Sequence, residues 1–123
     1  MLKIHARNLG NVAILCLRGR IVNGETESLQ RAADLNTDVR TLVLDLGGVS
    51  AIDAGGLGVM LTLREQAESK GIRFKLANVT KLVRRVLDIT RLDSVFEITS
   101  QTDVLPAISH GHQISASVLA ACA

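Results

Sequence analysis

Short apolar segments alternate along this chain of 123 residues with stretches whose apolar residues recur at helical spacing. Residues 12–17 and 41–46 are apolar almost throughout, whereas residues 79–87 carry the clearest helical repeat. A continuous apolar run indicates a strand covered on both faces, and an i, i+3, i+4, i+7 repeat indicates an amphipathic helix. Alternating strands and helices favour parallel strands joined by helical crossovers.

The full pattern predicts an α/β fold with one mixed sheet of about five strands and about four helices, in the order ββαβαβαβα. The expected strands are residues 2–5, 12–17, 41–46, 72–76 and 95–98, and the expected helices are residues 25–35, 57–70, 79–87 and 102–109. The turn cluster at residues 8–11 makes the first strand antiparallel to the second, and the others are largely parallel. We expect one domain over residues 1–109 and a loosely ordered tail over residues 110–123.

Polar residues predict where two of these helices begin. Asp53 precedes the second helix and Asn78 the third, and both residue types accept hydrogen bonds from free helical N–H groups. Gly71 is a natural stop for the second helix. The fourth helix is weakened by Pro106, which lacks an N–H group.

Composition excludes several classes of protein. The chain contains no Trp or Tyr and has a net charge of +2, which argues against nucleic-acid binding. No stretch approaches the ~20 apolar residues of a membrane helix, and the start does not resemble a signal peptide. Cys16 and Cys122 do not make a disulfide framework, so we expect a reducing, cytoplasmic environment.

Basic residues concentrate in one region. Residues 70–91 hold seven Lys or Arg and one acid, whereas the chain after Arg91 holds only Asp93, Glu97 and Asp103 as charged residues. This asymmetry allows an acidic partner to be steered toward that region. The alternative is a set of solvated helix and strand faces, which we expect to be the commoner explanation.

The most informative segment is residues 52–58, which contains Asp53 followed by Gly55, Gly56 and Gly58. Each glycine in a helix costs about 1 kcal/mol relative to alanine, so their presence needs a reason such as close approach of another backbone. The alternative is that they only let the turn bend. Their spacing matches neither nucleotide-binding glycine motif. Segments 23–25 and 78–79 are expected at the same sheet edge.

Catalytic and metal sites have little support. His5 is on an early strand, and His110 and His112 are in the tail, so no nucleophile–histidine–acid set can be assembled at the glycine segment. Asp45 and Asp53 could together hold Mg²⁺, but a strand-end hydrogen-bonding group and a helix cap are better interpretations. We expect no enzyme activity, no metal and no cofactor.

Four segments make the chain resemble the STAS domain family of bacterial anti-sigma factor antagonists and sulfate transporters. They are residues 17–21, residues 42–46, the Asp53-x-x-Gly56-Leu57-Gly58 element, and residues 87–92 before Phe96. The resemblance covers roughly residues 2–109. It implies a cytoplasmic antagonist that binds an anti-sigma factor, usually a serine kinase of the histidine-kinase-like ATPase fold, and so releases a sigma factor.

Two positions depart from the family pattern. The resemblance implies a phosphorylated Ser or Thr directly after the motif Asp, and here that position is Ala54. Many antagonists carry an Asp where this chain has Val22, which favours a divergent or non-kinase partner. We expect Ala54 not to be phosphorylated. Ser50, Thr80 and Thr90 are alternative acceptors that are better explained as turn or cap hydroxyls.

We therefore predict a partner-binding surface at the helix start and the preceding loop. It consists of Asn23, Gly24, Asp53, Ala54, Gly55, Gly56, Leu57 and Gly58, close to Glu25, Thr26 and the start of the third helix. Arg84 and Arg85 could orient an acidic partner. The alternatives are a regulatory subunit of a membrane transport ATPase and a nucleotide-binding or small-molecule-binding module.

Overall fold

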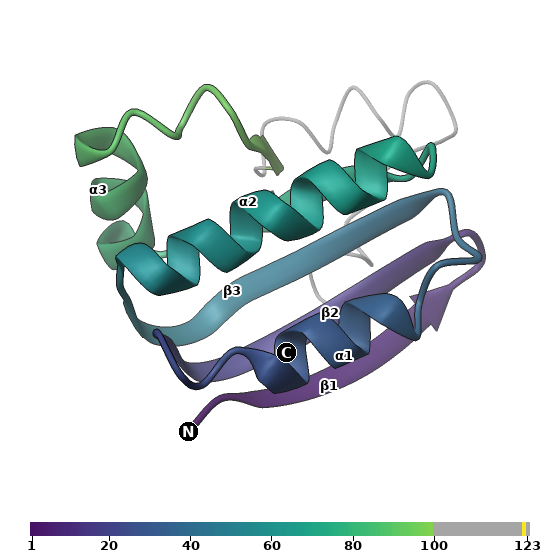
Figure 1. Ribbon diagram of the computed structural model, residues 1–123, viewed down its shortest axis with the longest axis horizontal. Coiled ribbons are helices and arrows are strands. Elements are labelled where there is room, and N and C mark those ends of the chain that lie inside the picture. Colours follow the sequence, from purple (N-terminus) through teal and green to yellow (C-terminus); the bar gives the residue numbers. More distant parts are fainter. Residues whose placement is uncertain (100–121, 123) are drawn as a thin grey trace.

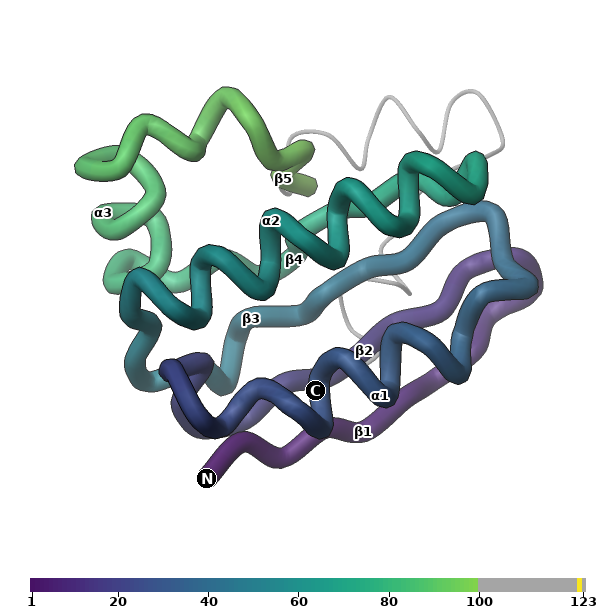
Figure 2. The backbone as a smooth tube through the Cα atoms, in the orientation of Figure 1, coloured from purple at the N-terminus to yellow at the C-terminus, as the bar shows by residue number. Residues whose placement is uncertain are grey.

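A computed structural model describes residues 1–99 and residue 122 (Figure 1), and it contains one five-stranded sheet in the order β1-β2-β3-β4-β5 (Figure 2). β1 is antiparallel to β2, and every other neighbouring pair is parallel. The mixed sheet and its expected strand directions are therefore confirmed. The strands are β1 Lys3–Leu9, β2 Val12–Ile21, β3 Thr41–Ile52, β4 Arg73–Ala77 and β5 Glu97–Thr99.

Three helices are found in the described part of the chain, where about four were expected for the whole. They are α1 Glu27–Asp34, α2 Ala54–Ser69 and α3 Lys81–Ile89. The expected helix at residues 102–109 lies outside the described residues, as does the predicted loose tail apart from residue 122. α1 and α2 lie side by side across one face of the sheet (Figures 1 and 2).

The main core lies between that face and the helices. Alternate strand residues, such as Leu15, Leu44 and Leu76, point into it and are fully buried. Each helix adds its apolar stripe, because Leu29, Met60, Val83 and Leu87 belong to the same cluster. Its only ring contact among the described residues joins Phe74 to Phe96, so the core is aliphatic as the composition requires.

β3 is longer than predicted. The sequence indicated a strand over residues 41–46 and then a loop, but β3 continues to Ile52 and stays paired with β2. The pairing register shifts on both sides of Gly48. A Cβ at Gly48 would stand 2.7 Å from the Cγ of Arg18, so this glycine lets the strands pass closely where the register changes. The glycines that suggested a loop thus permit an irregular strand.

The helix starts agree with the sequence at one position and differ at another. Asp53 caps α2 as predicted. Asn78 does not cap α3; it adopts a φ of +52° between β4 and the helix. The cap is Thr80, whose hydroxyl oxygen accepts a hydrogen bond from the Val83 backbone at 3.3 Å. The error arose because Asn and Thr are both good N-caps and stand two positions apart.

The second face of the sheet carries a smaller apolar cluster. Ile14, Val43 and Ala77 are buried there, and Val12, Cys16 and Cys122 pack against them. Cys16 and Cys122 form a disulfide across 106 positions of sequence, with their Cα atoms 5.6 Å apart. The sequence analysis did not predict this bond, because two cysteines alone do not indicate a disulfide framework. Two cysteines can form a disulfide at any sequence separation if the fold brings them close together. Here both cysteines lie on the second face of the sheet.

Candidate functional site

The Asp53 carboxylate joins two segments that are 30 positions apart in the sequence. Its Oδ1 accepts a hydrogen bond from the Gly56 backbone at 2.8 Å, which is the N-cap interaction of α2. Both carboxylate oxygens also accept from the Asn23 backbone N–H, at 3.1 Å each. One side chain therefore holds the loop after β2 against the start of α2.

The same hydrogen bonds favour the charged form of Asp53. The Gly56 N–H and then the Asn23 N–H stabilise the carboxylate and hold its pKa below the usual value for aspartate. The N-terminus of α2 adds a partial positive charge beside it. Asp53 is therefore an anion at neutral pH, and its negative charge lies at the exposed corner of the molecule.

Two of the three glycines in α2 are required by close packing. A Cβ at Gly55 would stand 2.7 Å from the Cβ of Asn23, and a Cβ at Gly56 would clash with the carbonyl oxygen of Ile21. This confirms close approach of another surface as the reason for these two glycines: the Ile21 backbone at Gly56 and Asn23 at Gly55. Gly58 differs, because a Cβ there would meet nothing within 4 Å.

The eight predicted site residues come together, but they differ in exposure. Asn23, Gly24, Asp53, Ala54 and Gly58 are exposed, Gly55 is half-buried, and Gly56 and Leu57 are buried. Leu57 belongs to the main core. The accessible surface is therefore a small polar patch around Ala54, supported from below by Gly56 and Leu57. Its role in partner binding remains a prediction.

The basic region predicted at residues 70–91 is divided by the fold. Arg73 and Lys75 lie on β4 and pair with Glu97, at 2.6 and 3.8 Å respectively. Arg84 and Arg85 are exposed on α3, and neither forms an ion pair within residues 1–99 or with residue 122. α2 follows β3 and α3 follows β4, and these two strands are parallel. Both helices therefore begin at the same end of the sheet, where the strands have their carboxyl ends (Figure 1).

The three alternative hydroxyl groups each have a local hydrogen bond. Ser50 donates to the carbonyl oxygen of Gly19 at 3.2 Å, and Thr90 donates to that of Val86 at 2.7 Å. Thr80 is the cap of α3. Thr80 and Thr90 are thus cap residues of α3, as interpreted from the sequence, whereas Ser50 lies within β3 and not in a turn.

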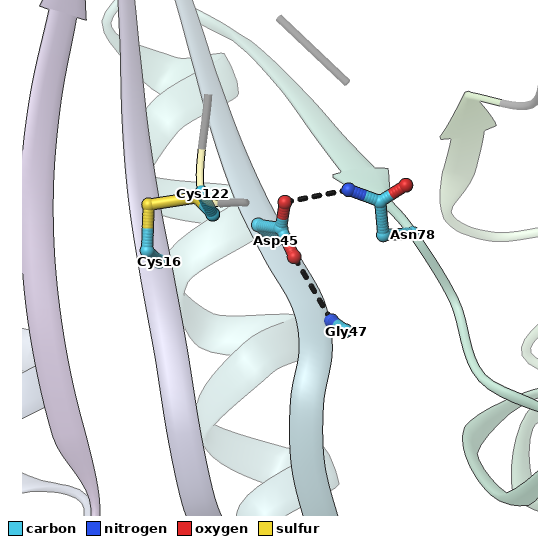
Figure 3. The surroundings of a disulfide bond; sticks show 5 residues. All are labelled: Cys16, Asp45, Gly47, Asn78 and Cys122. Carbon is cyan, nitrogen blue, oxygen red and sulfur yellow. Dashed lines mark hydrogen bonds between the residues drawn. A yellow bond between two sulfur atoms is a disulfide. The ribbon is translucent and has the colours of Figure 1, made fainter. Parts of the chain in front are cut away.

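Asp45 and Asp53 do not form one site. Asp45 is buried, and its carboxylate accepts hydrogen bonds from the Gly47 backbone at 2.9 Å and the Asn78 side-chain amide at 2.7 Å (Figure 3). Asp53 contacts Asn23 and Gly56 instead. The described residues hold no group of three or more side chains suited to a metal ion. Asp45 is thus a hydrogen-bonding group, as predicted, although within a strand and not at its end.

The link between Asp45 and Asn78 was not predicted, but the sequence carried a signal for it. Asp45 is the one charged residue inside an apolar run, and such a group must find hydrogen-bond partners when it is buried. The disulfide lies beside it on the same face (Figure 3). A hollow of about 530 Å³ borders Asp45, Asn78 and both cysteines.

Comparison with protein families identifies the whole architecture. The model of the STAS domain matches residues 3–104, which include every strand and helix of the described part. The chain belongs to the STAS domain family. The expectation drawn from its sequence motifs is confirmed. No helix in the described residues of this STAS domain is long and apolar enough to cross a membrane.

Two relatives of this STAS domain have been named for their function. A putative anti-sigma factor antagonist of Bordetella bronchiseptica, BtrV, is 27% identical over 108 residues, covering 86% of this chain and 93% of BtrV. The anti-sigma-B factor antagonist of Bacillus subtilis is 30% identical over 77 residues, covering 63% of this chain and 68% of that protein. Related sequences therefore include antagonists of anti-sigma factors.

Solved structures show the same fold. An anti-sigma factor antagonist from Mycobacterium paratuberculosis gives a TM-score of 0.71 at 20% identity, covering 89% of this chain and 95% of that one. A putative antagonist from Thermotoga maritima gives 0.73 at 21% identity, covering 86% and 94%. At this identity the likeness concerns the fold alone.

Proposed function

We propose that this STAS domain is an anti-sigma factor antagonist that acts by binding a protein and not by catalysis. The observation that carries the proposal is the corner at which Asp53 joins the loop after β2 to the start of α2. This corner presents a surface with few side chains, on which a partner's loop or helix can approach the backbone closely. The relatives named as antagonists support the role.

The proposed partner is an anti-sigma factor of the serine-kinase type, and binding it frees a sigma factor in the cytoplasm. Arg84 and Arg85 are exposed, so they can orient an acidic partner surface approaching the same sheet edge. Binding needs no cofactor or metal. The absence of bulky aromatic residues means that contact rests on backbone approach, aliphatic groups and arginine.

Ala54 bears on how partner binding is regulated. It is exposed at the first position of α2, directly after the capping Asp53, and it has no hydroxyl to accept a phosphate. A phosphoryl group there would add a charge of about −1.5 to −2 next to the Asp53 carboxylate. We infer that this chain stays competent to bind its partner where a phosphorylatable antagonist would be switched off.

The test introduces a negative charge at the same position. Ala54→Glu should weaken binding to the cognate anti-sigma factor by about tenfold or more, measured by calorimetry. The fold should be retained, because an acidic residue in the first turn of a helix is favourable. Gln66→Glu is the matched control, since it adds the same charge at an exposed position on the same helix.

Two outcomes would contradict the proposal. Equal affinity of the wild type and Ala54→Glu for the partner would show that this corner is not part of the interface. Transfer of labelled phosphate from the cognate kinase to the wild-type segment 50–58, mapped by mass spectrometry, would show that the chain keeps a phosphorylation switch despite Ala54.

A further inference from the structure

β1 is an edge strand with an unusual distribution of charge. It lies at one end of the strand order, and no strand pairs with its outer side in the part of the chain that the structure describes (Figure 1). It is seven residues long, and six of them are exposed. Such an edge presents a row of unpaired backbone N–H and C=O groups to a further strand.

Basic side chains gather on one face of this edge. The pairing register places Lys3 opposite Arg18 and His5 opposite Cys16, and residues opposite each other share a face. Cys16 belongs to the second-face cluster, so these side chains lie on the sheet face away from the helices. Together with Arg7 they border a hollow of about 350 Å³.

Within residues 1–99, no acidic side chain pairs with these basic groups. The first 24 residues of the chain contain four Lys or Arg and no Asp or Glu. Lys3, Arg7 and Arg18 are exposed and form no ion pair with any described residue. The nearest acid in sequence, Glu25, is already paired with Arg20 and the N-terminal amine.

We propose that β1 binds an extended acidic segment of a partner protein as an added strand. Lys3, His5 and Arg7 occupy alternate positions, so they are spaced about 6.8 Å apart along one face. A strand with Glu or Asp at every second position places its carboxylates opposite them, while the backbones of the two strands form hydrogen bonds. This surface is separate from the Ala54 corner.

A second copy of this chain is a poorer occupant of the same edge. Antiparallel pairing of two β1 strands about His5 would place Lys3 of each copy opposite Arg7 of the other. Like charges directly opposite each other destabilise a strand pair, and edge lysines are a common device against self-association. The charge that disfavours a second copy favours an acidic strand.

The experiment uses a fluorescein-labelled heptapeptide with Glu at alternate positions and Thr or Val between them, titrated with the full chain by anisotropy. It should bind about tenfold or more tightly than an isomer whose three Glu are consecutive. Lys3→Glu combined with Arg7→Glu should weaken binding about tenfold or more, whereas Lys70→Glu combined with Lys81→Glu, two exposed lysines elsewhere, should change it less than about twofold.

Further arms separate strand addition from charge attraction. The alternating peptide with N-methyl groups on alternate backbone nitrogens should lose binding, because it cannot form the ladder. Equal binding of the methylated or the consecutive-Glu peptide would overturn the proposal. The proposal would also be overturned if the double variant Lys3→Glu and Arg7→Glu bound the alternating peptide as tightly as the wild type does, with a circular dichroism spectrum that shows an unchanged fold.

Anionic vesicles rich in phosphatidylglycerol and a single-stranded oligothymidylate test the other anionic partners. Tighter binding of either than of the alternating peptide, lost in the Lys3 and Arg7 variant, would overturn the proposal in favour of that partner. Ala54→Glu should leave peptide binding unchanged, so this test can fail or succeed independently of the proposed antagonist function.

Discussion

Asp53 carries three hydrogen bonds that join a loop to a helix, and each of them requires an acceptor at this position. The carboxylate supplies two acceptor oxygens to two backbone donors from different segments. Asn could keep the Oδ1 contacts to both donors, but it would lose the negative charge and the second oxygen that also accepts from the Asn23 N–H. The residue therefore shapes the corner that we propose binds the partner.

The lowered pKa of Asp53 predicts a pH dependence. A carboxyl group with a depressed folded-state pKa stabilises the fold above its unfolded pKa of about 3.9, and this stabilisation is lost as the pH falls through the folded-state value. Asp53→Asn should lower the melting temperature at pH 7 and flatten its fall below about pH 4. Thermal melts between about pH 2 and 7 measure both effects.

Asp38→Asn is the control for this prediction, because Asp38 is an exposed acid whose side chain forms no hydrogen bond or ion pair with residues 1–99 or 122. It should leave the pH profile of the melting temperature close to that of the wild type. An Asp53→Asn profile that coincides with the wild type would show that the three hydrogen bonds do not depend on the charge.

At the scale of elements, the start of α2 is fitted to the end of β2. Gly55 and Gly56 let the first turn of the helix lie against Asn23 and Ile21, and no other residue type fits there without movement. Helix propensity alone would favour alanine at all three glycine positions. Packing excludes alanine at Gly55 and Gly56, whereas nothing in the packing excludes it at Gly58.

Two alanine substitutions should therefore change stability in opposite directions. Gly56→Ala should lower the free energy of unfolding by about 1 to 3 kcal/mol, because its methyl group clashes with the Ile21 carbonyl. Gly58→Ala should raise it by up to about 1 kcal/mol, because its methyl group enters open space. Urea unfolding of the two variants gives the comparison, and a stabilising Gly56→Ala would contradict the packing argument.

Most elements could be predicted from the sequence because their signals are local. The apolar run of β2, the helical repeat of α3 and the cap at Asp53 each depend on residues within a few positions. The length of β3 could not be predicted in this way. Its second half is a strand because β2 continues beside it, and only the fold places Gly48 against Arg18.

The candidate site was predictable to a similar degree. The sequence placed Asn23, Gly24 and residues 53–58 at one sheet edge, and the parallel strands bring them there. It did not show that the Asn23 backbone donates to Asp53, since a hydrogen bond between segments 30 positions apart has no local pattern. The exposure of Ala54 above a buried Leu57 also emerges only from the packing.

At the scale of the whole molecule, the disulfide ties residue 122 to the second strand of the sheet. A bond that closes so long a loop restricts the unfolded chain strongly, and native disulfides contribute typically about 2 to 4 kcal/mol. In a reducing cytoplasm the two cysteines would be thiols, so the stability of the chain should depend on the redox state.

Cys122→Ser should lower the free energy of unfolding by about 2 to 4 kcal/mol under oxidising conditions. Treatment with a dithiol should destabilise the wild type to a similar level and leave the variant unchanged. Urea unfolding with and without the dithiol measures both. Two alkylated cysteines in the oxidised wild type before reduction, seen by mass spectrometry, would show that the bond does not form.

The position of the disulfide also makes most of this small protein a closed covalent ring, because Cys16 and Cys122 span 106 positions and nearly all of the core lies between them. One proteolytic cut inside that ring opens the chain without separating the pieces. Nicked molecules would therefore migrate with intact ones on a denaturing gel until the disulfide is reduced.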